Sequence, residues 1–205
     1  MLVLHLVRHG DTAQSADGVF CGDLDPPLTA KGLGQADRLA HALSKLALTA
    51  AYVSPKLRAR LTAQPTLDAT RLTPTFEEGL REIGYGSWEG RKESEIRDSD
   101  PETYRNWVID PAVHAPPGGE SGYAIAARSV PVVERIRQAH PSGHVLIVSH
   151  KATIRVITCA LLNLHIGRFR DRVACPTASL TTFEFGDRGP MLVRIADTKH
   201  LEQRG

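Results

Sequence analysis

Two histidines in the sequence each follow a short apolar run, and an arginine directly precedes the first of them. His9 comes after the run 2–7 and Arg8. His150 comes after the run 144–148 and one serine. A neutral imidazole is nucleophilic at neutral pH, and a planar guanidinium matches the oxygens of a phosphate group. These residue types predict phosphoryl chemistry, provided that the fold brings the two histidines together.

The two apolar runs are too short for helices and rich in leucine and β-branched side chains, which is typical of strands buried on both faces. Ligands of open α/β sheets bind beyond the carboxyl ends of such strands. If the two runs are neighbours in a parallel sheet, both imidazoles lie in one crevice. Alone, Arg8 and His9 would more often form an ion pair or a packed core histidine, so the repeated layout carries the prediction.

A second arginine is expected to reach the same crevice. Residues 51–53 form a short candidate strand, and Ser54 followed by Pro55 indicates a helix start with the serine as N-cap. Arg58 would then lie in the first helical turn, beside free backbone N–H groups that suit an anion. By itself Arg58 would be a solvated surface charge, but two converging arginines suit a phosphate dianion.

The stretch 80–90 carries two carboxylates in a segment that glycines at alternate positions keep from forming a regular helix or strand. We interpret it as a shaped loop that presents Glu82 and Glu89. Trp88 is expected to anchor this loop by packing rather than to stack on a ligand.

The other segments alternate between helix and strand. Residues 13–27 are expected to form a loop with a binding role. Thr29 is a candidate N-cap for an amphipathic helix whose buried face is expected to include Leu33 and Ala47. Further helices are expected over 120–139, kinked at Pro131, and over 152–162, and strands over 72–76, 181–185 and 191–196.

This order predicts an α/β chain, a three-layer αβα sandwich with a mostly parallel central sheet. The length suits a single domain over residues 1–205. Residues 91–117 are polar and contain four prolines, and we expect them to form a small lid insertion over the crevice. Edge strands and this lid offer surfaces through which a homodimer could form.

Composition excludes several classes of protein. The 25 Lys and Arg residues nearly balance the 23 Asp and Glu residues, and there is no basic run, so nucleic-acid binding is not expected. The three cysteines are widely spaced and argue against a disulfide framework or a thiolate zinc site. The N-terminal apolar run has no basic leader and stops at Arg8, which argues against a signal peptide or membrane span. A cytoplasmic protein with no membrane partner is therefore expected.

Six motifs, in order along nearly the whole chain, resemble those of the histidine phosphatase superfamily, the phosphoglycerate-mutase-like proteins. Each motif is weak alone, but six in sequence are specific. They are Arg8-His-Gly10, Cys21-Gly-Asp-Leu-Asp-Pro-Pro-Leu-Thr29, Ser54-Pro-Lys-Leu-Arg-Ala59, Leu80-Arg-Glu-Ile-Gly-Tyr-Gly-Ser-Trp-Glu-Gly90, Pro117-Gly-Gly-Glu-Ser121 and Val148-Ser-His150.

The resemblance implies the roles of the site residues. His9 would attack phosphorus in line and form a phosphohistidine, while Arg8, Arg58 and His150 neutralise the phosphate oxygens. Glu82 would give a proton to the leaving group and then activate the water that cleaves the intermediate. Two arginines and a cationic imidazole supply the positive charge, so neither a metal ion nor another cofactor is expected. The other seven histidines show no metal-ligand spacing and are interpreted as surface or packing residues.

The chain departs from the family pattern at three positions. Ser15 stands where many members carry an asparagine that touches the phosphate. Cys21 replaces a common glutamine, and it either lines the pocket or is a spectator thiol. Lys151 replaces the familiar glycine, and it either reaches a second anionic group of the substrate or points into solvent.

Glu89 remains the alternative proton donor, or a brace for its loop. The substrate-binding set expected is Arg8, Ser15, Cys21, Gly22, Arg58, Glu82, His150 and Lys151.

Phosphatases and mutases of this family share their chemistry and differ in the acceptor of the phosphoryl group. The mutases carry a lysine where this chain has Glu93, and a carboxylate there would repel a phosphoglycerate, so hydrolysis of a small phosphomonoester is expected. The alternatives are a phosphoglycerate-type mutase, a protein phosphatase, and a catalytically silent protein that binds a phosphorylated ligand. A silent protein would be expected to lack His9, Glu82 or an arginine, and all are present. The lid residues Arg91, Lys92, Arg97, Arg105, Trp107 and His114 do not select one substrate.

Overall fold

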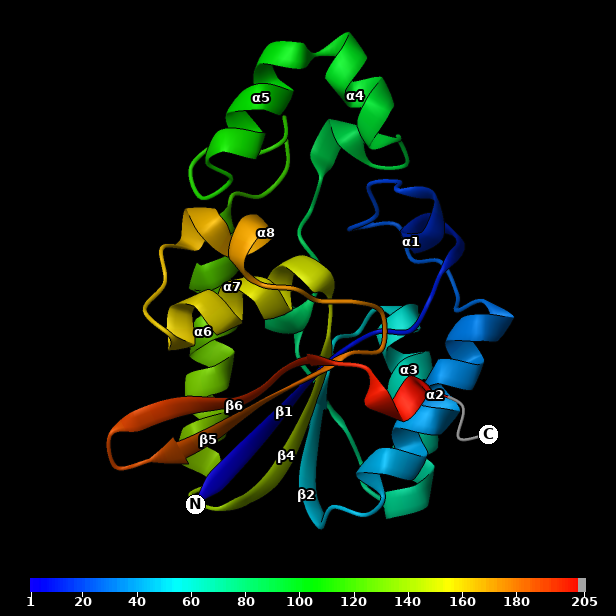
Figure 1. Cartoon of the computed structure of the whole chain (residues 1–205), viewed down its shortest axis with the longest axis vertical. Coiled ribbons are helices and arrows are strands. Elements are labelled where there is room, and N and C mark those ends of the chain that lie inside the picture. The colour runs from blue at the N-terminus through cyan, green and yellow to red at the C-terminus, as the bar shows by residue number, and fades with distance from the viewer. Residues whose placement is uncertain (203–205) are drawn as a thin grey trace.

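One six-stranded sheet forms the centre of the molecule (Figure 1). The computed structural model describes residues 1–202. The strand order is β3-β2-β4-β1-β5-β6, with β1, β2, β3 and β4 parallel, β5 antiparallel to β1, and β6 antiparallel to β5. The α/β class and the mostly parallel sheet are therefore confirmed. The strands are β1 (Leu2–Arg8), β2 (Leu48–Val53), β3 (Thr75–Phe76), β4 (Gly143–Ser149), β5 (Leu180–Gly186) and β6 (Gly189–Asp197).

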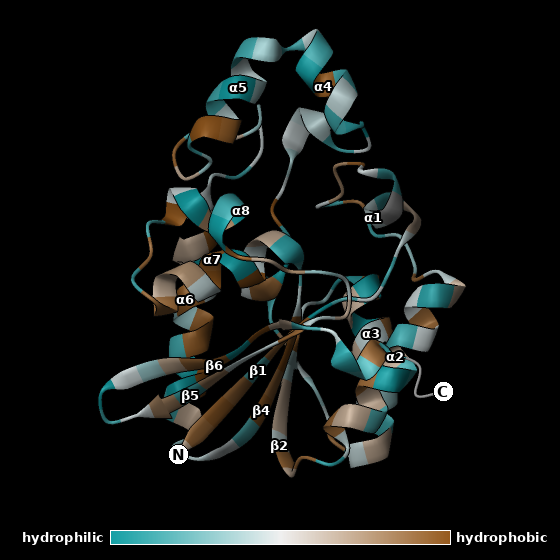
Figure 2. Ribbon diagram, in the orientation of Figure 1, coloured by the Kyte–Doolittle hydropathy of each residue, from teal (hydrophilic) through white to brown (hydrophobic). Residues whose placement is uncertain are grey.

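Helices cover both faces of the sheet, as the three-layer prediction requires. On one face, Leu4 and Leu6 of β1 pack with residues of α6 and α7. On the other face, Val7 packs with residues of α2 and α3. Figure 2 shows the resulting apolar centre, with β1 and β4 largely hydrophobic along their length. The helices are α1 (Ala13–Asp17), α2 (Ala30–Leu43), α3 (Leu57–Thr70), α4 (Glu93–Ser99), α5 (Pro101–Ile109), α6 (Gly122–Ala139), α7 (Lys151–Leu161) and α8 (Phe169–Arg172).

The pairing of β1 with β4 brings the two predicted histidines together. The strands run parallel in a register that sets Arg8 opposite Ser149. His9 and His150 therefore leave the sheet side by side, at the carboxyl ends of two central strands. Gly10 then passes so close to the start of α2 that a Cβ atom there would lie 2.8 Å from the carbonyl oxygen of Gly32. The chain can turn into the crevice here only because Gly10 has no side chain.

Several local predictions were wrong in detail. Residues 13–17, expected in a loop, form the short helix α1, which Thr12 caps with its side chain. In α2, Leu33 is 48% exposed and Gln35 is buried, while Ala47 lies beyond the end of the helix. Gln35 is buried because its side-chain oxygen accepts from the backbone N–H of Asp11. A hydrogen bond from a backbone N–H thus keeps this polar residue in the core, and the periodicity of apolar residues does not reveal such a bond.

Two element boundaries also differ from prediction. The helix expected to start at Ser54 begins at Leu57, and its N-cap residue Lys56 makes no side-chain capping bond. The strand expected over 72–76 is reduced to the two residues of β3. The helices expected over 120–139 and 152–162 and the hairpin of residues 181–196 are present, shifted by one or two residues at their ends.

The segment 91–117 contains α4 and α5, which stand at the end of the molecule remote from the sheet (Figure 1). Trp107 of α5 is 3% exposed and packs edge-on against Trp88, with ring centroids 5.2 Å apart. Phe20 and Ile96 complete this aromatic cluster. Trp88 is therefore a packing residue, as expected, and the cluster joins the two helices to the loop 80–90. Within residues 1–202, no helix is long and apolar enough to cross a bilayer.

A buried histidine pair in the sheet predicts how stability depends on pH. His5 of β1 is 5% exposed and its ring lies parallel to that of His144, with an Nε2–Nδ1 distance of 3.0 Å. Burial, with the charges of His144 and Arg194, lowers the pKa of His5 to about 4. Since the unfolded chain binds this proton near pH 6.5, stability is lost as the pH falls from about 6.5 towards 4.

We expect His5 alone to lower the free energy of unfolding by about 2 kcal/mol between pH 7 and pH 5. Urea denaturation at the two pH values measures this loss. The His5→Leu variant should show a smaller loss than the parent, because only the parent must protonate His5 on unfolding. An equal loss in the two proteins would contradict the assignment.

Candidate active site

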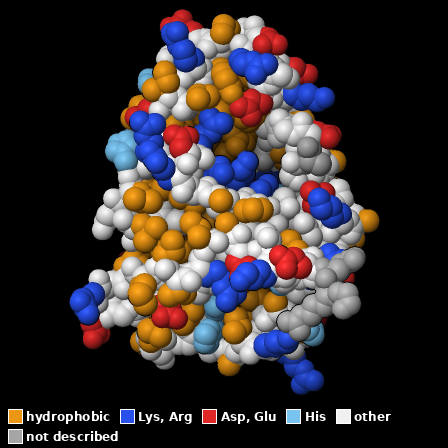
Figure 3. All heavy atoms as spheres, viewed as in Figure 1, with side chains coloured by type: hydrophobic (Ala, Val, Ile, Leu, Met, Phe, Trp, Pro, Cys, Tyr) orange, Lys and Arg blue, Asp and Glu red, His pale blue; other side chains and the backbone are white. Residues whose placement is uncertain are grey.

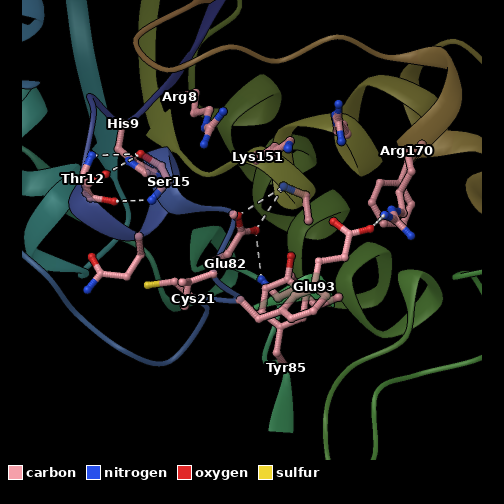
Figure 4. A pocket seen from close by; sticks show the side chains of 18 of the residues that line it. Arg8, His9, Thr12, Ser15, Cys21, Glu82, Tyr85, Glu93, Lys151 and Arg170 are labelled. Carbon is pink, nitrogen blue, oxygen red and sulfur yellow. Dashed lines mark hydrogen bonds and ion pairs between the residues drawn. The ribbon is translucent and has the colours of Figure 1, made fainter. Parts of the chain in front are cut away.

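A pocket of about 390 Å³ opens beyond the carboxyl ends of β1 and β4. Figure 3 shows it as a hollow in the surface with Lys and Arg side chains inside it, and Figure 4 shows its lining from close by. Seven of the predicted site residues line it: Arg8, His9, Ser15, Cys21, Arg58, Glu82 and Lys151. His150 is fully buried directly behind His9, and their ring centroids are 5.1 Å apart. Gly22 does not line the pocket.

The tautomer of His9 follows from its surroundings. Its Nδ1 lies 2.8 Å from the carbonyl oxygen of Gly10. A carbonyl only accepts, so Nδ1 carries the proton and Nε2 keeps its lone pair. Burial, with the charges of Arg8 and Arg58, holds the pKa of His9 well below its usual value of 6.5. His9 is therefore a neutral imidazole whose unprotonated nitrogen is available as a nucleophile.

The His150 ring is held by a hydrogen bond to Ser54, which the sequence predicted to be a helix cap. Its Nε2 lies 2.7 Å from the hydroxyl of Ser54, which is the serine expected to cap α3. Its Nδ1 is buried and has no hydrogen-bond partner among the described residues. Burial, and then the charges of Arg58 and His9, lower the pKa of His150 well below 6.5. These surroundings favour the neutral ring, whereas the sequence led us to expect a cationic imidazole.

The two predicted arginines differ in how firmly they are fixed. Arg58 is 1% exposed and donates to the carbonyl oxygens of Leu24, at 2.6 Å, and Gly22, at 3.0 Å. It also lies 3.5 Å from a carboxylate oxygen of Asp25. Arg8 donates to the carbonyl oxygen of Cys175 at 2.7 Å, while its Nε is buried without a partner. Both guanidiniums are thus oriented by backbone carbonyls before a ligand arrives, and such preorganised donors stabilise charge in a dry site.

The structure distinguishes the two carboxylates of the loop 80–90. Glu82 lines the pocket, and its Oε1 accepts from the N–H groups of Ile83, at 3.0 Å, and Ala152, at 3.1 Å. Glu89 lies outside the pocket and accepts from four backbone N–H groups, including those of Gly22 and Tyr85. Glu89 therefore braces the loop, and Glu82 is the carboxylate within reach of a ligand.

Among the loop residues, Ser15 and Cys21 line the pocket and Gly22 supports it. The Ser15 hydroxyl donates to the carbonyl oxygen of Thr12 at 2.9 Å, so its proton is already used within the cap of α1. Cys21 is half-buried, and burial raises the pKa of its thiol. Gly22 is required for packing, because a Cβ atom there would lie 1.8 Å from the carbonyl oxygen of Ile83.

Sequence reasoning missed part of the lining. Of the lid residues singled out, only Trp107 reaches the pocket. Arg155 and Arg170 line it but were not predicted. Arg155 could have been found, because it lies one helical turn after Lys151 and so on the same face of α7. Arg170 lies on the short helix α8, which no pattern in the sequence predicted. Among residues 1–202, no cluster of three or more His, Cys, Asp and Glu side chains is arranged to hold a metal ion.

Comparisons with known proteins agree with this geometry. Residues 4–198 match the model of the histidine phosphatase superfamily, branch 1. Phosphoserine phosphatase 1 of Hydrogenobacter thermophilus is 33% identical over 98% of this chain and 95% of its own length. The adenosylcobalamin/alpha-ribazole phosphatase of Salmonella typhimurium is 30% identical over 85% of this chain and 88% of its own length. The solved structure of YhfR from Bacillus stearothermophilus superposes with a TM-score of 0.91 at 31% identity, over 98% of this chain and 100% of that one.

Proposed function

The chain belongs to branch 1 of the histidine phosphatase superfamily, a family of phosphatases, and we propose that it hydrolyses small phosphomonoesters through a phosphohistidine intermediate without a metal ion. The observation that carries the proposal is the state of His9. Its ring is neutral, its Nδ1 proton is fixed by Gly10, and its Nε2 faces a pocket that holds two oriented guanidiniums. This combination suits in-line attack on the phosphorus of a bound ester.

In the proposed first step, Nε2 of His9 forms a bond to phosphorus while the bond from phosphorus to the ester oxygen breaks. The leaving alkoxide takes a proton from Glu82 and departs as an alcohol. In the second step, Glu82 accepts a proton from water as the water oxygen attacks the phosphohistidine. Inorganic phosphate leaves, and His9 is again neutral. The hydrogen bonds that Glu82 accepts from Ile83 and Ala152 keep its carboxylate at one place through both steps.

Positive charge for the transferring group comes from Arg8, Arg58 and His150 in this mechanism. The unpartnered Nε of Arg8 and Nδ1 of His150 are buried polar atoms with unused hydrogen-bonding capacity. A bound phosphate dianion favours protonation of the neighbouring neutral imidazole, because it places an opposite charge beside the ring. We therefore propose that His150 becomes cationic when the substrate binds. This would reconcile its neutral resting state with a role in neutralising phosphate oxygens.

Hydrolysis is favoured over phosphoryl transfer to a second substrate. Glu93 lines the pocket and is paired with Tyr104 and Arg170. The lysine that the mutases carry at this position is therefore missing, and with it the positive charge it would supply. The relatives named above are phosphatases. Transfer from a bisphosphate primer to a monophosphoglycerate that outpaced phosphate release would contradict this proposal. No observation favours a catalytically silent protein, since His9, Glu82 and both arginines are in place.

We propose that α4 and α5 form the lid over the substrate. Trp107 and Val108 of α5 and Glu93 of α4 line the pocket on the side away from the sheet. The pocket volume of about 390 Å³ lies at the lower end of the range for small-molecule sites. A small phosphorylated metabolite fits within such a space.

We expect the protein to hydrolyse p-nitrophenyl phosphate in the presence of excess EDTA at the same rate as without it. Side chains supply the positive charge around phosphorus in this mechanism, so removing divalent cations should not change the rate. Release of p-nitrophenolate, followed by absorbance, measures the rate. Loss of turnover in EDTA that magnesium or zinc restored would show that the proposed metal-free mechanism is wrong.

A further inference from the structure

A group of basic side chains lines the pocket beyond the residues assigned to the phosphoryl group. Lys151 and Arg155 come from successive turns of α7, and Arg170 comes from α8. Figure 4 shows Lys151 in the wall between Arg8 and Arg170. The mechanism proposed above uses Arg8 but leaves these three cations without a role.

Charge pairing separates Arg170 from the other two. The Arg170 guanidinium lies 3.8 Å from a carboxylate oxygen of Glu93 and 3.6 Å from the ring centroid of Trp107. Among residues 1–202, no carboxylate oxygen lies within the 4.0 Å ion-pair distance of Lys151 or Arg155. Arg170 therefore has an ion-pair partner, whereas Lys151 and Arg155 have none at this distance.

Burial and neighbouring positive charges act on both members of this pair. Partial burial and the charges of Arg155 and Arg8 lower the pKa of Lys151. Burial and the charges of Arg8 and Arg170 lower the pKa of Arg155, while Cys175 and Glu82 act on both groups in the opposite direction. The Nε of Arg155 is buried without a partner. Like charges that repel one another in a partly dry site are relieved by a bound anion. A hydrogen-bond donor with no partner gives that anion a specific contact.

Resting on the phosphatase function proposed above, we infer that Lys151 and Arg155 form a second anion subsite, which selects phosphomonoesters that carry a further anionic group. The phosphoryl group is held by Arg8, Arg58 and His150, so the second group must lie towards α7, on the leaving-group side of the ester. A carboxylate and a second phosphate share the chemistry that such a subsite recognises. Glu93 does not prevent this, because Arg170 compensates its charge.

Matched substrate pairs test the inference in the parent protein. 3-Phosphoglycerate and glycerol 3-phosphate differ in whether a carboxylate or a neutral hydroxymethyl group ends the chain. Fructose 1,6-bisphosphate and fructose 6-phosphate differ by one phosphate. We expect kcat/KM for the more anionic member of at least one pair to be higher by roughly tenfold, the effect of one charge-assisted hydrogen bond. A preference in only one pair identifies the anion, and a preference in both shows that charge decides.

Two variants and a control locate the effect. Lys151→Gln and Arg155→Gln should each reduce the preference between the members of a pair by about threefold to tenfold. Lys45→Gln removes one positive charge from an exposed residue that does not line the pocket, and it should leave the preference unchanged. The preference should also fall as salt is raised, since the subsite is partly open to solvent.

The outcomes separate this inference from the function on which it rests. If the parent hydrolyses the paired substrates with equal kcat/KM, or keeps its preference in both variants, the second subsite is wrong although the phosphatase stands. If the parent hydrolyses neither these esters nor p-nitrophenyl phosphate, the phosphatase function itself is wrong. The parent ratio requires no substitution, so a variant that fails to fold does not leave the inference undecided.

Discussion

Replacing His9 with alanine should reduce kcat on p-nitrophenyl phosphate by on the order of 10⁴-fold or more, the scale seen when a nucleophile is removed. Alanine has no nitrogen to attack phosphorus, and a water molecule in the vacated space lacks the fixed position that the hydrogen bond to Gly10 gives the ring. The guanidiniums of Arg8 and Arg58 remain. The variant should therefore still bind inorganic phosphate, which isothermal titration measures.

The matched control is His41→Ala, which removes an exposed histidine from α2. It should turn over at the parent rate. A second readout is the covalent intermediate: acid-sensitive, base-stable phosphate should label the parent after rapid quenching and should be absent from the His9→Ala variant. Turnover in that variant within tenfold of the parent, or labelling that survives the substitution, would show that another residue is the nucleophile.

Replacing Glu82 with glutamine should slow hydrolysis by an amount that depends on the leaving group. An alkyl phosphate such as glycerol 3-phosphate releases a strongly basic alkoxide, which needs the proton, so we expect a loss of about 10²- to 10⁴-fold. p-Nitrophenolate leaves without protonation, so the substitution should slow the first step on p-nitrophenyl phosphate much less. Single-turnover formation of the phosphoenzyme from the two esters measures this difference directly.

Glu89→Gln provides the control for a structural role. Glu89 accepts hydrogen bonds from the backbone N–H groups of Gly22, Asp23, Leu24 and Tyr85, which ties residues 22–24 to the loop 80–90. Glutamine keeps an acceptor oxygen but loses the charge. We expect a lower free energy of unfolding and equal effects on both esters. If Glu89→Gln, and not Glu82→Gln, showed the dependence on leaving group, the two carboxylates would have to exchange roles.

The central sheet could be predicted from sequence because its signal is local. The buried strands β1 and β4 are short, largely apolar runs, and the polar residues that end them mark where the crevice lies. The pairing of these two strands joins segments that are far apart in sequence. It was inferred because each strand is an apolar run followed by a histidine. The start of α3 was predicted less well, because Ser54 had two available partners. Its hydroxyl bonds the His150 ring, 96 residues away in sequence, and the Asp25 carboxylate instead accepts from the backbone N–H of Leu57 at the start of the helix.

The site was predictable where the chain carries motifs and was not predictable where tertiary contacts decide. His9, Glu82 and Arg58 stand in recognisable motifs and line the pocket. The different roles of Glu82 and Glu89 could not be assigned from their spacing in sequence. These roles depend on which backbone N–H groups donate to each carboxylate. Arg170 reaches the pocket from α8, and its position is fixed by Trp107, a residue from a different segment of the chain.

The start of α7 has a consequence for how this enzyme can diversify. His150 is its N-cap residue, and the backbone of Ala152 fixes Glu82, so the reacting groups depend on the main chain of this turn. Lys151 and Arg155 stand on successive turns of α7 and contribute only their side chains. Exchanges at these two positions could therefore retune which metabolite is accepted while the geometry at phosphorus stays intact, and new specificities become accessible one substitution at a time.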